Sequence, residues 1–210
     1  MHYGPLLDVF VLDGRTFRTP NDTGAGTAML GAAQARWLVD AMASSMARWK
    51  LVANPQPVGL LMSDSGRIEG WGNGAGGPPV GREVELATIL GELGKRRVKN
   101  ALWITADVHY AAAHHFDAQR ANVDLAFEPF YELIAGPIHA GTFGPEPLDP
   151  TFGAELKFQW VPPTGTGNLA PWDGMQTFGT IDVSPDALAI ALWAIDGTPR
   201  YRVEVPYVAS

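Results

Sequence analysis

The apolar residues of this chain alternate between the spacing of a strand and that of a helix, and this alternation constrains the fold more than any other feature. Residues 6–12 form a short apolar segment rich in branched side chains, typical of a buried strand, and the segment ends at Asp13-Gly14-Arg15. From residue 31 to residue 49, apolar positions recur every three or four residues, as on one face of an amphipathic helix. A strand followed by a helix favours an α/β fold.

The same order repeats further along the chain. Residues 50–53 form a second short strand before Asn54-Pro55, residues 82–95 return to helical spacing, and residues 101–106 form another apolar strand. Beyond them, apolar segments separated by Gly/Pro turns predict strands near residues 130–135, 156–161, 178–183, 188–195 and 201–207, and the last third of the chain is expected to be a β meander. No linker or repeat divides the 210 residues, so we expect one α/β domain, residues 1–210, with a β-rich carboxyl-terminal third.

The composition excludes several classes of protein. With 22 acidic against 15 basic residues and no Lys/Arg-rich run, the chain offers no evident nucleic-acid-binding surface. No apolar run approaches the roughly 18 residues of a membrane span, and the first residues lack the pattern of a signal peptide. The absence of cysteine excludes disulfides, thiolate metal ligands and a cysteine nucleophile.

The 24 glycines and 17 prolines predict long loops, above all an irregular segment over residues 58–81. Within it, residues 72–77 match the spacing of a dinucleotide-binding fingerprint, but no strand precedes them and Pro78-Pro79 follows where a helix should begin. The chain also has no Gly-x-Ser-x-Gly elbow and no Walker-type loop. Nucleotide-cofactor, serine hydrolase and nucleoside triphosphatase functions are therefore not supported.

The best candidate for chemistry is Asp107-Val108-His109, which directly follows the apolar strand at residues 101–106. In open α/β sheets, ligands bind at the carboxyl ends of the strands. A carboxylate and an imidazole two residues apart could both bind one cation, or His109 could act as a general acid or base beside Asp107. A structural alternative is that Asp107 caps the following segment and His109 is a hydrogen-bonded, partly buried side chain.

Three further histidines are weaker candidates. We expect His114 and His115 on a helical turn, where adjacent residues cannot both face one site, and a solvated pair is the favoured interpretation. His139 lies in a Gly/Pro loop after a strand, where an imidazole is unusual as core filler but could stabilise the loop by a hydrogen bond.

Several ordered blocks of the sequence resemble one known family. Residues 100–110, preceded by Gly81-Arg82-Glu83 and followed by residues 113–115, are similar to a block of the PhoD-like alkaline phosphatase family of metallophosphoesterases. The resemblance covers nearly the whole chain, because further blocks follow the order of that family at residues 12–18, 34–38, 127–132, 136–144, 148–153 and 174–179.

The resemblance implies a phosphomonoesterase or phosphodiesterase that acts on a small phosphate ester, and a metallophosphoesterase-like layered α/β/β/α sandwich, here partial. It also implies metal ions, with calcium and ferric iron as the expected ones, and an exported protein. Asp107 and His109 match the active-site Asp-x-His of the family, and Asp13 and Arg15 match its Asp-x-Arg block. The resemblance thus predicts Asp107, His109 and Asp13 as metal ligands, and His109, Arg15 and His139 as catalytic residues.

The chain also departs from the family. An Asp-rich metal shell comes from the amino-terminal half of such proteins, and nothing before Leu6 corresponds to it; Ala75 also stands where relatives are expected to carry an acid. The chain therefore resembles the carboxyl-terminal part of the family's domain. The alternatives are a half-enzyme completed by an amino-terminal half or by a homo-oligomer, and a non-catalytic binding module. We expect the loops at residues 72–79 and 136–150 to frame the phosphate site.

Overall fold

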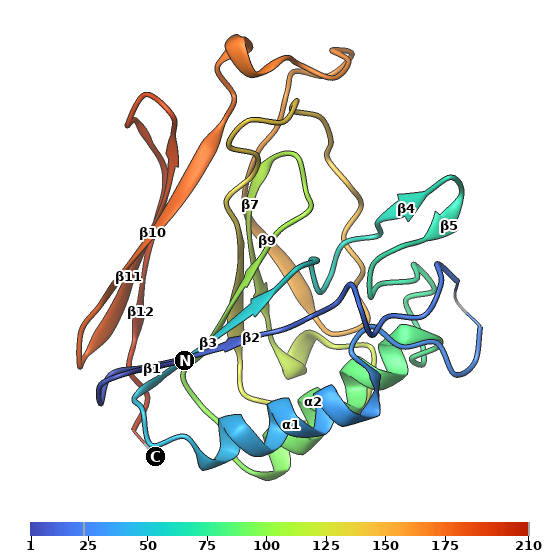
Figure 1. The fold of residues 1–210 in the computed structure, drawn as a ribbon, viewed down its shortest axis with the longest axis vertical. Coiled ribbons are helices and arrows are strands. Elements are labelled where there is room, and N and C mark those ends of the chain that lie inside the picture. Colours follow the sequence, from blue (N-terminus) through green and yellow to red (C-terminus); the bar gives the residue numbers. More distant parts are fainter. Residues whose placement is uncertain (23, 210) are drawn as a thin grey trace.

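The computed structural model describes residues 1–22 and 24–209, and its centre is a seven-stranded mixed sheet (Figure 1). Four neighbouring strands of this sheet run parallel, in the order β2, β3, β6 and β8, while β1, β7 and β9 are antiparallel to their neighbours. In sheet order the strands are β1 (His2–Tyr3), β2 (Leu7–Val11), β3 (Trp49–Asn54), β6 (Ala101–Thr105), β8 (Phe130–Ile134), β7 (Ala111–Phe116) and β9 (Ala154–Trp160).

Two helices and a second sheet cover the two faces of this sheet, which gives three layers and confirms the predicted α/β class with a β-rich end. The helices α1 (Gly31–Ser44) and α2 (Arg82–Lys95) pack through residues such as Leu38 and Leu90 onto one face, against the side chains of Phe10, Val52 and Trp103. The opposite face, with Leu102 and Leu133, packs against the second sheet. Alternating side chains along each strand therefore serve two separate cores.

The second sheet is the predicted meander of β10 (Thr177–Val183), β11 (Ala187–Ala194) and β12 (Pro199–Pro206). The strand expected near residues 156–161 exists as β9, but its assignment to this meander is wrong, because β9 pairs with β7 at the edge of the large sheet. The remaining elements are the hairpin β4 (Ser63–Asp64) and β5 (Arg67–Ile68) and two short 3-10 helices, η1 (Ala118–Arg120) and η2 (Pro171–Asp173).

Two predicted elements differ from the structure. Helix α1 ends at Ser44 instead of residue 49, because Trp49 begins β3 and its Nε1 donates a hydrogen bond of 2.8 Å to the carbonyl of Ser184, while Met46 is 93% exposed. The segment expected to be a helical turn around His114 is strand β7. Pairing with β8 on one side and β9 on the other stabilises this strand against the helix preference of its three alanines.

Candidate active site

The predicted site residues follow the carboxyl ends of three of the four parallel strands, so they lie along one edge of the large sheet. Asp13 and Arg15 follow β2, Asp107 and His109 follow β6, and His139 follows β8. Between β2 and β6 lies β3, whose end brings Asn54 and Gln56 to the same edge. The arrangement therefore has the topology expected for a ligand site in an α/β sheet.

Asp107 has an unusual backbone and one specific side-chain partner. Its φ of 67° lies in the left-handed region, which costs a residue with a side chain on the order of 1 kcal/mol. Its Oδ2 accepts a hydrogen bond of 3.0 Å from Nε2 of Gln56, a residue that is only 5% exposed. The chain thus leaves β6 through a strained turn, and Gln56 orients the carboxylate at that turn.

His109 is half-buried and held in one orientation from two sides. Its Nδ1 lies 2.6 Å from the carbonyl oxygen of Gly141, and its ring stacks on Phe143 with 4.3 Å between the ring centroids. Because a carbonyl oxygen can only accept, Nδ1 carries the proton, and the neutral ring keeps a free lone pair on Nε2. This is the arrangement in which a histidine can accept a proton or bind a metal through Nε2.

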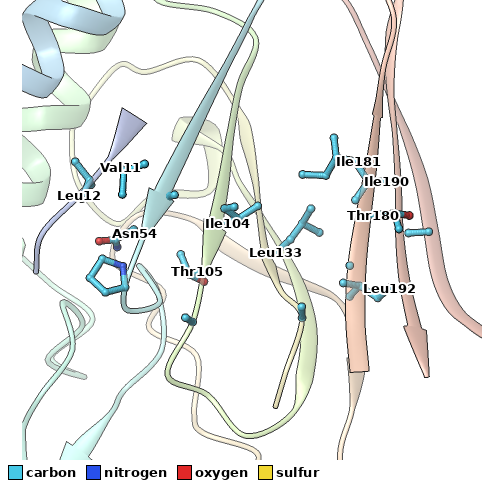
Figure 2. Close-up of a pocket in the computed structure, with 16 residues that line it drawn as sticks. Val11, Leu12, Asn54, Ile104, Thr105, Leu133, Thr180, Ile181, Ile190 and Leu192 are labelled. Atoms are coloured by element: carbon cyan, nitrogen blue, oxygen red, sulfur yellow. The ribbon is translucent and has the colours of Figure 1, made fainter. Parts of the chain in front are cut away.

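Asp107 and His109 line a small recess of about 210 Å³ together with Glu69, Phe143 and Glu146. A larger cleft of about 500 Å³ lies between the two sheets (Figure 2). Apolar side chains such as Ile104, Leu133, Ile181 and Leu192 line it, and its lining within the described parts of the chain contains no titratable group. The smaller recess is therefore the better candidate for proton transfer.

The Asp13 carboxylate stabilises its own turn. Its Oδ1 accepts hydrogen bonds from the backbone N–H groups of Thr16 and Arg15, at 2.7 and 2.9 Å. These hydrogen bonds, above all the one from Thr16, lower the pKa of the Asp13 carboxyl. The side chain of Arg15 is exposed, and its guanidinium contacts no carboxylate in the parts of the chain that are described. Arg15 is therefore free to bind an anionic group.

The other histidines lie in very different surroundings. His139 is exposed in the loop after β8, and its role as a catalytic residue stays a prediction. The prediction of a solvated pair at His114 and His115 is wrong, because adjacent residues of strand β7 point to opposite faces of the sheet. His114 is 1% exposed and bonded to Glu132 at 2.8 Å, whereas half-buried His115 contacts Arg120.

The two Gly/Pro loops differ in their relation to this site. The loop over residues 136–150 contributes the carbonyl of Gly141 and the ring of Phe143, both of which contact His109. The loop over residues 72–79 is instead held by two buried acids, since Asp149 accepts from the N–H of Gly74 and Glu83 accepts from the side chain of Asn73. Burial, and then the charge of Asp149, raise the pKa of Glu83 to about 7.

The donor set at this edge does not amount to a complete metal site. Among the residues that the structure describes, no three His, Asp or Glu side chains come together closely enough to hold a metal ion. Three buried side-chain oxygens near Asp107 lack a hydrogen-bond partner in the described ranges, on Asn54, Gln56 and Thr105. Neutral oxygens with a single carboxylate are a poorer set than the several carboxylates that usually hold calcium. The assignment of Asp13, Asp107 and His109 as metal ligands stays a prediction.

Sequence reasoning did not identify Gln56 or Phe143, the two side chains that hold Asp107 and His109. Gln56 could have been found, since it follows the predicted strand at residues 50–53 and carboxyl ends of parallel strands share an edge. Nothing in the sequence pairs Phe143 with His109, because loop geometry sets their contact.

Comparison with known proteins gives the family of the chain. The family described as PhoD-like phosphatase matches residues 1–188. A solved structure titled "Structure of PhoD" has a TM-score of 0.61 and 17% sequence identity, and the match covers 98% of this chain and 40% of that one. This chain thus spans less than half the length of that protein, and no curated protein matches it. Because the family match extends over most of its residues, the chain belongs to the PhoD-like phosphatase family.

Proposed function

We propose that this chain forms part of a phosphoester hydrolase site, with Asp107 and His109 as the residues closest to the reacting group. One observation supports the proposal most: the fixed tautomer of His109 leaves a proton-accepting Nε2 in a ring that lines the recess beside Asp107. Membership of the PhoD-like phosphatase family supports the same reaction class. The substrate we propose is a small phosphate ester.

The side chains at this sheet edge can transfer a proton, bind the phosphate and hold the attacking group. His109 can accept at Nε2 a proton from the attacking water as the water oxygen bonds to phosphorus, and can then give that proton to the oxygen of the departing alcohol. The Gly141 carbonyl keeps the ring in place. Exposed Arg15, and His139 as a weaker candidate, can neutralise the charge of a phosphate at the same sheet edge. Asp107, oriented by Gln56, is placed to hold the attacking group.

The proposal assigns two possible metal ligands but no metal-dependent step. Asp107 and His109 would give a metal two ligands, and we derive no step through it because the described residues do not complete the set. Further ligands would have to come from other residues, either in the same polypeptide or in a partner. Calcium, ferric iron and export are the finer expectations from the resemblance, and they stay predictions.

The test is hydrolysis of p-nitrophenyl phosphate and of bis(p-nitrophenyl) phosphate, with calcium plus iron and again after chelation. We expect Asp107→Asn and His109→Ala each to lower kcat/KM by about 100-fold or more. The matched controls are Asp124→Asn and His2→Ala, which change an exposed aspartate and an exposed histidine away from this edge. Both controls should keep the activity of the unchanged protein.

Two outcomes would contradict the proposal. Turnover that survives both Asp107→Asn and His109→Ala would place the reaction elsewhere in the protein. A folded protein without turnover under any metal condition, both alone and mixed with an amino-terminal half of a PhoD-like phosphatase, would favour the non-catalytic binding module. Turnover that appears only on mixing with an amino-terminal half of a PhoD-like phosphatase would support the half-enzyme.

A further inference from the structure

Glu132 is a carboxylate in the middle of the large sheet and has no part in the proposed reaction. It lies on β8 between β6 and β7, its side chain is 0% exposed, and its register partners are Trp103 and His114. A buried charge costs several kcal/mol unless hydrogen bonds and an opposite charge compensate it. A hydrophobic residue would fill such a core position at lower cost, so the carboxylate calls for another explanation.

Each oxygen of this carboxylate has a hydrogen-bond partner. Oε2 lies 2.8 Å from Nδ1 of His114, which is itself buried on the neighbouring strand β7. Oε1 accepts a hydrogen bond from the backbone N–H of Val58, which belongs to the loop that follows β3. The His114–Glu132 pair therefore reaches out of the sheet and holds a loop through its backbone.

The loop held by Glu132 is the one that orients Asp107. Gln56 stands two residues before Val58, and its side-chain amide donates to Oδ2 of Asp107 at 3.0 Å. The carbonyl of Gln56 in turn accepts a hydrogen bond of 2.6 Å from Nδ2 of Asn54, at the end of β3. Gln56 and Val58 are 5% and 1% exposed, so the segment between them is fixed inside the protein.

We propose that Glu132, held by His114, is a positioning residue that sets the orientation of the Asp107 carboxylate through the loop carrying Gln56. This inference rests on the proposed function for its consequence in turnover. Its structural part, the coupling between Glu132 and the Gln56–Asp107 contact, stands on hydrogen bonds and burial alone.

The first test measures the coupling between Glu132 and the Gln56–Asp107 contact by hydrogen exchange and NMR, so it does not depend on enzymatic activity. In Glu132→Leu, we expect the amide of Val58 to exchange with deuterium at least about 10-fold faster, because its buried acceptor is gone. The NMR signals of the Gln56 side-chain amide should move in the same direction as in Asp107→Ala, where the acceptor itself is removed. Glu132→Gln keeps an acceptor oxygen for Val58 and should preserve most of the protection.

A matched control variant tests whether the effect is specific to Glu132, and a second variant is available if Glu132→Leu does not fold. Glu128→Leu makes the same change just before β8, at a half-buried glutamate away from the Gln56 loop, and should alter neither signal. If Glu132→Leu does not fold, Glu132→Asp keeps the charge beside His114 but withdraws the carboxylate by one methylene group, and it should show the same loss at Val58. Unchanged Gln56 and Val58 signals in folded Glu132→Leu, or in folded Glu132→Asp where the leucine variant does not fold, would overturn the proposal.

The second test measures turnover of bis(p-nitrophenyl) phosphate. We expect Glu132→Leu and Gln56→Leu each to lower kcat by about 10-fold with KM within about twofold, because Asp107 is displaced but not removed. Since both act through one contact, the double variant should be no worse than the poorer single variant. Fully additive losses, or a Glu132→Leu enzyme as active as Glu128→Leu, would overturn the positioning role.

The two tests separate the possible failures. If the unchanged protein shows no turnover, either alone or mixed with an amino-terminal half of a PhoD-like phosphatase, the proposed function fails, and the NMR measurements still decide whether Glu132 controls the Gln56–Asp107 contact. If turnover is present and the NMR signals do not respond, the proposed function stands and the positioning role is wrong.

Discussion

The side-chain amide of Gln56 donates a 3.0 Å hydrogen bond to Oδ2 of Asp107, although the two residues stand 51 positions apart in the sequence. They meet because β3 and β6 are neighbouring parallel strands whose last residues, Asn54 and Thr105, lie opposite each other. The two segments after these strands therefore leave the sheet side by side. Only the segment after β6 does so with a left-handed residue, Asp107.

The left-handed backbone of Asp107 predicts a conflict between stability and function. Asp107→Gly and Asp107→Ala both remove the carboxylate and its hydrogen bond to Gln56, but only glycine adopts a φ of 67° without strain. We expect the glycine variant to have a free energy of unfolding about 1 kcal/mol higher than the alanine variant, while both lose turnover. Urea denaturation at one pH measures the difference, and equal stabilities would contradict the strain.

The buried carboxyl of Glu83 predicts that stability falls as the pH rises. Its pKa in the folded protein is about 7 against an ordinary 4.5, so between these values the folded protein holds a proton that the unfolded chain releases. The contribution of Glu83 to the free energy of unfolding should therefore be constant below about pH 4.5 and decrease between about pH 4.5 and about pH 7. At about 1.4 kcal/mol per pKa unit, the loss is roughly 3 kcal/mol in all.

Urea denaturation at several pH values between 4.5 and 8 checks this slope. Glu83→Gln should flatten it, because the amide does not titrate. Glu92→Gln is the matched control on the same helix, since a hydrogen bond from Lys95 lowers the pKa of Glu92 below the window. Asp149, whose pKa is also lowered, titrates below the window as well. A slope that persists in Glu83→Gln would assign the titration to another group.

Much of the fold could be predicted from the sequence because local periodicity carries it. The helix at residues 82–95 coincides with α2, and the strand at residues 101–106 with β6 to within one residue. Periodicity failed where pairing decides the outcome, as at β7, whose Ala-rich sequence suits a helix but which lies between two strands. It also failed at Trp49, which extends β3 because its ring packs between the sheets.

The site was less predictable than the fold. Strand ends indicated Asp107 and His109, since apolar segments and the residues after them can be read locally. The partners that orient them, Gln56 and Phe143, come from other strands and loops, and single-sequence patterns do not give such contacts. Glu132 was missed because a glutamate inside an apolar segment gives no sign of being buried.

The guanidinium of Arg82 predicts a large loss of stability on substitution. Arg82 is 2% exposed and donates hydrogen bonds to four backbone carbonyls, in segments 19–20 and 69–70. Arg82→Met leaves these carbonyls unpaired and should lower the free energy of unfolding by about 3 kcal/mol or more, and Lys, with its single ammonium group, should not restore it. Exposed Arg96→Met, which breaks a surface ion pair, should cost less than about 1 kcal/mol in the same urea denaturation. Equal effects of the two would contradict the proposed role of Arg82 in joining these segments.

Alanine substitutions at two glycines of α2 are expected to differ strongly in their effect on stability. A Cβ on Gly94 would lie 1.9 Å from the backbone oxygen of Ala126, so the segment over residues 121–129 could pack this closely on α2 only without a side chain there. A Cβ on Gly91 would meet only the flexible end of the Leu125 side chain, at 2.9 Å. Alanine gains about 1 kcal/mol over glycine within a helix, which offsets the small strain at Gly91 but not a clash with backbone. We therefore expect Gly94→Ala to lower the free energy of unfolding by about 3 kcal/mol and Gly91→Ala to change it by less than about 1 kcal/mol in urea denaturation. A Gly94→Ala protein as stable as the unchanged one would mean that α2 and this segment are further apart than the structure places them.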